Sequence, residues 1–234
     1  MKKKKYNLSI IIFIVLEVIL SFFVHLTSGT LNTITSFFTV VLAFLFALIN
    51  YNKINKLIVF GLLMTVCADI FLVVLDPMKQ NLAMFFFSIT QICYFIYIYN
   101  NQNNKERKLN VIIRISTIVF ALLITLLVLK ENTDFLSMIS LFYYANLLVN
   151  VAFSFLVKNK NIYFIIGLIL FACCDLVIGI SIMNDAYLSL REGTLLYFIA
   201  NPGFNLAWIF YIPSQTLIAL STKKDYNLNK NVQL

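Results

Sequence analysis

Long apolar segments separated by short polar connections follow one another along the whole chain. Each segment is about as long as the ~20 residues that an α-helix needs to cross the ~30 Å hydrocarbon core of a bilayer. Runs such as SIIIFIVLEVIL do not alternate between apolar and polar residues, so they favour helices over the strands of a barrel. The pattern predicts eight membrane-spanning helices: residues 7–27, 31–49, 57–76, 81–100, 109–130, 135–157, 161–183 and 204–221.

The composition agrees with this pattern. Hydrophobic residues make up 61% of the 234 residues and charged residues 12%, whereas soluble domains are roughly half apolar and a quarter charged. We therefore predict an all-α fold, a polytopic membrane bundle that forms one transmembrane domain over residues 1–234. The opening MKKKK and its apolar run resemble a secretory signal, but the run is long and no small-residue cleavage site follows, so we expect a retained first helix.

Basic residues are distributed unevenly between the two ends of the predicted helices. The side that holds both tails carries fourteen lysines and arginines, and the other side carries three: Lys79, Lys130 and Arg191. Because positively charged connections are retained in the cytoplasm, both termini are predicted to be cytoplasmic, in a multi-pass protein of a bacterial-type plasma membrane. Arg114, just inside the fifth helix, is expected to extend toward the basic side. The net charge of +8 thus reflects topology, and no nucleic-acid partner is expected.

One pattern occurs twice in the chain. Residues 61–69 read GLLMTVCAD and residues 167–175 read GLILFACCD, so each stretch has an aspartate eight residues after a glycine. Each stretch lies on the third helix of a group of four. A rise of 1.5 Å per residue puts the two aspartates ~20 Å and ~22 Å from the basic side. The matching spacing and depth predict two parallel four-helix repeats, residues 7–100 and 109–221.

The two aspartates, Asp69 and Asp175, define the candidate site. A carboxylate within a spanning helix costs ~2.5–3.5 kcal/mol on insertion scales, so both should face the bundle interior or water. Three roles fit: hydrogen bonding between helices, binding of a cation or proton in a small transporter or sensor, and acid/base catalysis. Two neighbouring carboxyl groups at low dielectric would share one proton. Such a pair provides an acid and a carboxylate for cleaving acid-labile ethers and acetals through an oxocarbenium-like cation.

Other polar residues also lie within apolar runs. Glu17 is either a buried hydrogen-bond partner or part of the site, and Thr65 lies four residues before the first aspartate on the same helix face. Tyr143, Asn146 and Asn150 share a helix face and are expected to bond between helices. The four cysteines match no metal-binding spacing and are interpreted as packing residues, and no metal or organic cofactor is expected. Residues 184–203 are predicted to form a short interfacial helix or a lid.

These residues resemble the pattern of the lysoplasmalogenase-like, or YhhN, family of polytopic membrane proteins. The resemblance covers most of the chain and is carried by the two glycine-to-aspartate spacings and the motif of the last helix: Gly61, Asp69, Gly167, Phe171, Asp175, Ser214, Gln215, Leu217 and Ile218. Two features differ. Gln91 stands three residues before Tyr94, where the family often has a histidine, and the Lys-Pro pair that commonly enters the second helix is absent.

The resemblance implies hydrolysis of the vinyl ether bond of lysoplasmalogens to a fatty aldehyde and a glycerophospho-base, without a metal or organic cofactor. Asp69 and Asp175 would form the catalytic pair, and a lysolipid substrate would enter from among the membrane lipids. The residues expected to contact the substrate are Glu17, Thr65, Gln91, Tyr94 and Gln215. Glutamine cannot shuttle a proton near neutral pH, so a family member that has lost catalysis is a further hypothesis beside the transporter or sensor.

Overall fold

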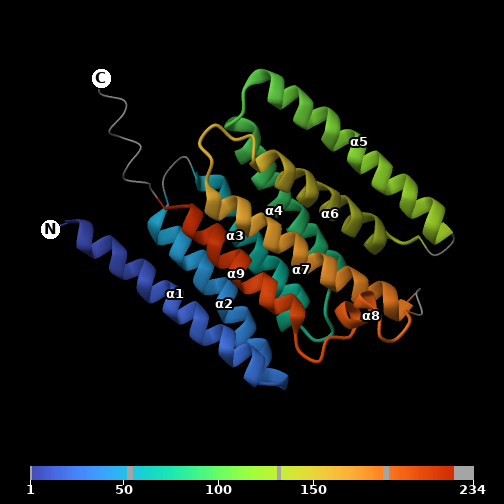
Figure 1. The fold of residues 1–234 in the computed structure, drawn as a ribbon, viewed down its shortest axis with the longest axis horizontal. Coiled ribbons are helices and arrows are strands. Elements are labelled where there is room, and N and C mark those ends of the chain that lie inside the picture. Colours follow the sequence, from blue (N-terminus) through green and yellow to red (C-terminus); the bar gives the residue numbers. More distant parts are fainter. Residues whose placement is uncertain (1, 52–54, 131–132, 187–189, 224–234) are drawn as a thin grey trace.

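Helices make up the regular elements of the computed structural model in the part of the chain that it describes, residues 2–51, 55–130, 133–186 and 190–223 (Figure 1). This finding confirms the predicted all-α class. The elements are α1 (Lys2–Leu26), α2 (Gly29–Asn50), α3 (Lys56–Asp69), the π-helical turn η2 (Ile70–Val74), α4 (Gln80–Asn100), α5 (Asn104–Leu129), α6 (Phe135–Ser154), α7 (Ile162–Ala186), α8 (Leu195–Ala200) and α9 (Leu206–Ser221).

Seven helical segments of the described chain are long and apolar enough to cross a membrane. Six are α1, α2, α4, α5, α6 and α7, and the seventh joins α3 to η2 over Lys56–Val74. The chain is therefore a multi-pass membrane protein. The eighth predicted segment, residues 204–221, forms α9, whose 16 residues are fewer than a usual span. A total of eight spans and the cytoplasmic position of both termini stay predictions.

The polar connections that were predicted to share one side of the membrane meet at one end of the bundle. At that end, the Asn55 side chain donates to the Thr222 carbonyl oxygen at 3.1 Å and the Asn161 side chain donates to the Ser221 carbonyl oxygen at 2.8 Å. The Lys158 N–H donates to a carbonyl of the α4–α5 connection at 3.1 Å. These bonds join the α2–α3, α4–α5 and α6–α7 connections and the end of α9, and Figure 1 shows the start of α1 at the same end.

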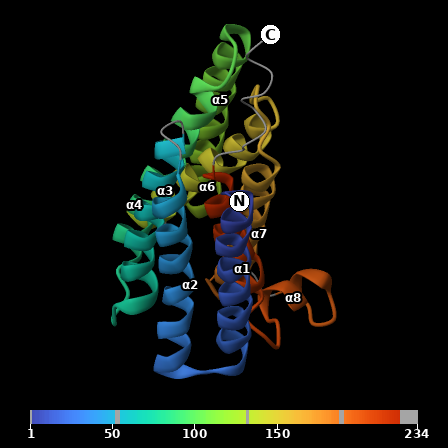
Figure 2. The ribbon, with the colours of Figure 1, turned by 90° about the vertical axis from the view of Figure 1, so that its left-hand side faces the viewer.

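The helices of each half pair in the same way. The most extensive contacts join α3 to α4 and α7 to α9, while α4 also packs against α6 and α9 against α2. α1 and α5 lie at opposite edges of the bundle, and α8 stands out from its side (Figures 1 and 2). If α9 is counted as the fourth helix of the second half, the third and fourth helices pair in both halves. In addition, the fourth helix of each half contacts the second helix of the other.

Each of the two main helix pairs meets at a glycine. A Cβ atom at Gly61 would collide with the Tyr94 ring, and one at Gly167 would lie 2.7 Å from Ile218 Cγ1 and 3.1 Å from the Ser214 carbonyl oxygen. Glycine is needed here because small residues let helix backbones approach closely. Tyr94 and Ile218 each follow the glutamine of their helix by three residues. The two contacts are therefore equivalent in the predicted repeats, and the duplication itself stays a prediction.

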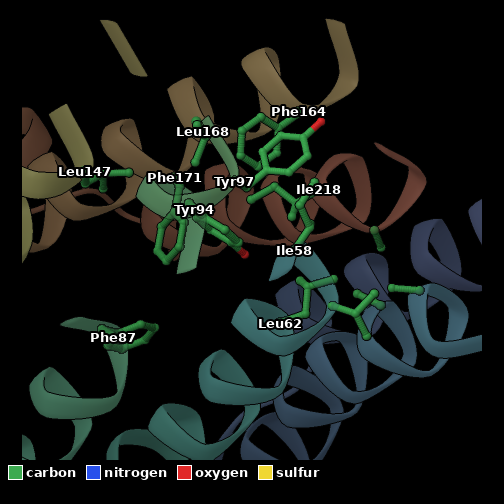
Figure 3. Packing of buried hydrophobic residues seen from close by; sticks show 14 of the residues in the cluster. Ile58, Leu62, Phe87, Tyr94, Tyr97, Leu147, Phe164, Leu168, Phe171 and Ile218 are labelled. Carbon is green, nitrogen blue, oxygen red and sulfur yellow. The ribbon is translucent and has the colours of Figure 1, made fainter. Parts of the chain in front are cut away.

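Aromatic and aliphatic side chains from α3, α4, α7 and α9 fill the centre of the bundle (Figure 3). Phe164 at the start of α7 packs against Tyr94 and Tyr97 of α4, with ring centroids 5.5 and 5.1 Å away. The outer faces are also apolar. On α5, for example, Phe120 is 64% and Leu127 is 72% exposed. Large apolar residues on this outer face are suited to lipid rather than water.

The segment before the last helix forms a shorter helix than its sequence predicts. Of residues 184–203, the structure gives α8 the six residues Leu195–Ala200, and residues 187–189 of the prediction lie outside the described part. The Thr194 side chain caps α8 by accepting a bond from the Tyr197 N–H at 3.2 Å. Ser181 of α7 donates to the Ala200 carbonyl oxygen at 3.1 Å. This bond joins the end of α8 to the last turns of α7.

Candidate functional site

A tyrosine holds each of the two aspartates. Tyr211 of α9 donates from its hydroxyl group to Asp69 Oδ2 at 2.7 Å. Tyr143 of α6 donates in the same way to Asp175 Oδ2. Both bonds join different helices, so each carboxyl group is fixed by a neighbour far away in the sequence. In each aspartate the Oδ1 atom is left for a proton or a substrate.

A change in helix geometry fixes the position of Asp69. It is the last residue of α3, and the π-helical turn η2 starts at the next residue. The Leu75 N–H donates to the Ile70 carbonyl oxygen at 3.0 Å, five residues earlier, instead of four as in an α-helix. Such insertions shift the helix face that follows and often occur at functional sites. The residues after Asp69 therefore do not continue the face of α3 that leads to it.

The two tyrosines that bond to the aspartates belong to one aromatic cluster. Phe171, one turn before Asp175 on α7, has its ring centroid 5.6 Å from that of Tyr211 and 6.4 Å from that of Tyr143. Phe87 of α4 packs against Phe171 and Tyr143 at 6.0 and 5.5 Å. Phe171 therefore contacts the tyrosine partner of each aspartate. The structure thus places the predicted pair around one aromatic cluster in the interior of the bundle, between α3, α6, α7 and α9.

The two carboxyl groups differ in accessibility. Asp69 is 1% exposed, whereas Asp175 is half-buried. A cavity of about 220 Å³ lies between α7, α8 and the start of α9, and it is lined in part by Ile178 and Ala207. Ile178 follows Asp175 by three residues, and Ala207 precedes Tyr211 by four, so the cavity begins about one helical turn from the pair. The aspartates themselves do not line it.

The other predicted substrate-binding residues have different neighbours. Thr65 does not bond to the aspartate one turn away: its hydroxyl donates to the Gly61 carbonyl oxygen at 3.1 Å and lies 3.4 Å from the Thr90 hydroxyl. The Gln91 side chain accepts a bond from Asn150 at 3.0 Å. Both residues therefore contribute to contacts between helices in this structure. No finding tests whether they touch a substrate.

Tyr94, Gln215 and Glu17 lie at three further places. The Tyr94 ring fills the space beside Gly61 and packs on Phe164. Gln215 on α9 is 1% exposed, and its side-chain oxygen and nitrogen have no hydrogen-bond partner in the described chain. Glu17 on α1 lines a second cavity, between α1 and α9. The structure therefore places the predicted catalytic pair around one cluster, whereas the predicted substrate contacts lie at several helix interfaces.

Arg114 extends toward the basic side as expected, but its guanidinium group ends in a buried cluster and not at the surface. It is 6% exposed and donates to the side-chain oxygens of Asn146 and Asn150 at 2.7 and 2.8 Å, and to that of Asn110 at 3.2 Å. Its guanidinium carbon lies 4.1 Å from the centroid of the Phe95 ring. A buried charge needs such partners in place of water, and the amide oxygens of two helices provide them.

The expected role of Asn146 and Asn150 between helices is confirmed. Through Arg114 they join α6 to α5, and the Asn150 side chain also donates to the side-chain and carbonyl oxygens of Gln91 on α4 at 3.0 and 2.9 Å. Tyr143 lies one turn before Asn146 on the same helix. One side of α6 thus carries the two asparagines that bond to Arg114 and also Tyr143, which bonds to Asp175.

Sequence reasoning missed the role of Tyr211, and it gave Tyr143 a bond between helices without naming Asp175 as the partner. A tyrosine in an apolar helix looks like any other packing aromatic, and this chain has 12 tyrosines. A usable signal was position: Tyr143 precedes Asn146 by three residues and Tyr211 precedes Gln215 by four, so each shares a helix face with an inward-facing amide.

Comparison with known proteins gives one match. The model of the YhhN family matches residues 31–222, which run from the start of α2 to the end of α9 and leave α1 outside. Both aspartates and both tyrosines fall within the matched region. No curated protein and no solved structure matches the chain.

Proposed function

This chain belongs to the YhhN family, and we propose that it is an integral membrane hydrolase that cleaves the vinyl ether bond of lysoplasmalogen-like lysolipids. The products are a fatty aldehyde and a glycerophospho-base. The observation that carries this proposal is the pair of interior carboxyl groups, Asp69 and Asp175, each fixed by a tyrosine whose ring packs on Phe171. The family resemblance of the sequence motifs supplies the substrate class.

The reaction needs an acid and a base that exchange roles. The protonated carboxyl group adds its proton to the alkene carbon that does not bear the ether oxygen, which forms an oxocarbenium ion. The ionised carboxylate stabilises this cation and takes a proton from the water that attacks it. The resulting hemiacetal then loses its hydroxyl proton to the first group. The second group protonates the departing glycerol oxygen, so the pair returns to its starting state and one water is consumed.

The pair has the properties that this chemistry requires. Two nearby carboxyl groups in a medium of low dielectric cannot both ionise at low cost, so one proton is shared between them. The hydrogen bonds from Tyr143 and Tyr211 each occupy one oxygen and hold the group in a fixed direction. We assign the first contact with substrate to Asp175, because it is the more exposed of the two.

We place the approach of the substrate to Asp175 at the cavity beside α8, because this cavity is lined by Ile178, one helical turn from Asp175. Its volume of about 220 Å³ suits the vinyl ether region of a lysolipid rather than the whole molecule. The acyl-like tail would then extend into the bilayer along the apolar outer faces of α7 and α9. The bond between Ser181 and Ala200 closes one side of this entrance, so the segment that was predicted to be a lid borders the proposed path.

The test is aldehyde release by purified protein in lipid nanodiscs, measured by mass spectrometry. Asp69→Asn and Asp175→Asn are each expected to lower the rate at least ~100-fold, because general acid or base groups contribute ~10²–10⁴-fold. In D₂O the aldehyde should carry one deuterium on the carbon next to its carbonyl group. Full activity in either variant would remove that residue from the mechanism. Ion-dependent flux without product would favour the transporter.

Asp134→Asn is the matched control. Asp134 caps α6 by accepting a bond from the Ser137 N–H at 2.8 Å, and this backbone bond lowers the pKa of Asp134. The variant therefore removes a negative charge, as the test variants do. Asparagine caps a helix as well as aspartate does, so wild-type activity is expected.

A further inference from the structure

Glu17 is a buried carboxyl group that the proposed hydrolysis does not use. It lies at the middle of the first span, Leu8–Leu26, and is 3% exposed. Neither of its carboxylate oxygens makes a hydrogen bond of normal geometry in the described chain, although the Thr216 hydroxyl lies close to them. Glu17 also lies outside the region that the family model matches. A buried carboxyl group without such a hydrogen bond is a candidate for pairing with a ligand.

A cavity of about 250 Å³ adjoins this carboxyl group, between α1 and α9. Glu17, Ser21 and His25 lie on it at intervals of four residues, so they form one stripe along α1. Phe22 and Val18, which also line it, are 66% and 49% exposed on the outer surface of the bundle. The cavity is thus bordered by lipid-facing side chains, and an apolar molecule can reach it from the bilayer.

Two residues that line the cavity, Glu17 and Thr216, can accept hydrogen bonds from a ligand. The Thr216 hydroxyl already donates to the Ile212 carbonyl oxygen at 2.8 Å, so its lone pairs are what it can offer a ligand. Lipid tails cannot satisfy a carboxylate, whereas a cation with several N–H donors can pair with Glu17 and also donate to the Thr216 hydroxyl.

In the part of the chain that the structure describes, no other acidic residue lies on the helices around the cavity that could pair with such a cation. The sequence of α2, which packs on α1, contains no acidic, basic, tyrosine or cysteine residue. Tyr211 is the one titratable residue of α9, and it donates to Asp69. His25 is exposed at the far end of the stripe, two turns from Glu17. The group that can pair with a ligand's charge is therefore Glu17.

We propose that this cavity binds a small apolar ammonium ion from the bilayer, with Glu17 as its counter-charge. An unpaired charge is too costly in this position, so the empty site holds a neutral carboxyl group. Binding of R–NH₃⁺ then releases the carboxyl proton and forms an ammonium–carboxylate pair. A cavity of ~150 Å³ holds benzene, so 250 Å³ accommodates one aromatic ring with a short aminoalkyl chain.

The test is calorimetric binding of 2-phenylethylammonium to the full chain in nanodiscs, with empty nanodiscs subtracted. We expect saturable binding with release of about one proton in weakly buffered solution, and weaker binding of the neutral analogue 2-phenylethanol. Glu17→Gln should lower the affinity at least ~10-fold, since hydrogen bonds to charged groups contribute this much. Equal affinity in Glu17→Gln, or binding without proton release, would overturn the proposal.

Three further variants test whether binding depends on this cavity and is independent of the aspartate pair. Ser21→Phe fills the cavity but keeps the carboxyl group, so it should abolish binding, and retained binding would contradict the assigned cavity. Glu106→Gln is the matched control, because Glu106 belongs to the capping box of α5 and glutamine preserves that motif. Asp69→Asn should bind normally. If hydrolysis fails and these results hold, only the hydrolase proposal is wrong.

Discussion

At the scale of single residues, the proposed site depends on the tyrosine that orients each carboxyl group as well as on the carboxyl group itself. Tyr211 supplies the bond to Asp69 at 2.7 Å while its ring packs against Phe171 and Trp208 at 5.6 and 5.3 Å. The hydroxyl group thus acts on the site, and the ring belongs to the core. A substitution that removes the hydroxyl group and keeps the ring therefore separates the effect on the site from the effect on core packing.

We therefore expect Tyr211→Phe to lower kcat for aldehyde release about 10-fold or more, with little change in KM. A hydrogen bond to a charged group contributes ~1.5–3 kcal/mol, and its loss leaves Asp69 misoriented without altering the lipid-binding surface. Steady-state kinetics in nanodiscs would measure both constants. Tyr97→Phe is the control, since Tyr97 packs against Phe164 away from the aspartates. A change in KM alone would assign Tyr211 to substrate binding instead.

The residues that sequence reasoning did and did not identify differ in one physical respect. An aspartate within an apolar helix is costly, so Asp69 and Asp175 were apparent from the sequence alone. A tyrosine costs little there and its partner lies on another helix, so the roles of Tyr143 and Tyr211 depend on packing. The burial of Arg114 was not apparent from the sequence, because the amide cluster that receives it is formed in part by a helix 32 residues later.

At the scale of elements, helix contacts depend on glycines at defined places. Gly167 and Gly179 both lie on α7, but a Cβ at Gly167 would be 3.1 Å from two backbone atoms of α9, while a Cβ at Gly179 would meet nothing within 4 Å. Backbone atoms cannot rotate away as a side chain can. The two positions therefore provide a matched pair on one helix.

Gly167→Ala is expected to destabilise the protein by about 1–3 kcal/mol, the usual cost of overpacking. Gly179→Ala should be neutral or stabilising by up to about 1 kcal/mol, because alanine favours the helix more than glycine does. Reversible unfolding in mixed micelles would give both free energies. Equal effects at the two positions would show that the α7–α9 contact does not need the glycine.

Apolar length and spacing predicted the helices well, because each span must satisfy its backbone internally. The exceptions are local. The π-helical turn after Asp69 and the short α8 depend on tertiary contacts such as the bond from Ser181 to Ala200. Apolar composition over residues 204–221 also did not indicate that α9 would have 16 residues.

At the scale of the whole molecule, α9 decides how many times the chain crosses the membrane. Sixteen residues rise ~24 Å, less than the ~30 Å hydrocarbon core. However, α9 starts beside α8 and ends where Asn55 and Asn161 bond to the Ser221 and Thr222 carbonyl oxygens, at the opposite end of the bundle. It therefore runs the full distance between the connections on the two sides.

We predict an eighth crossing and a cytoplasmic C-terminus, since the end that α9 reaches is the one with the basic connections. Green fluorescent protein fused after residue 234 should fluoresce, and alkaline phosphatase fused after Gly193 should be active. Fluorescent protein fused after Gly193 is the control and should stay dark. The opposite pattern would invert the orientation. If alkaline phosphatase were instead active at both positions, α9 would not cross, and the two halves of the chain could not be parallel repeats.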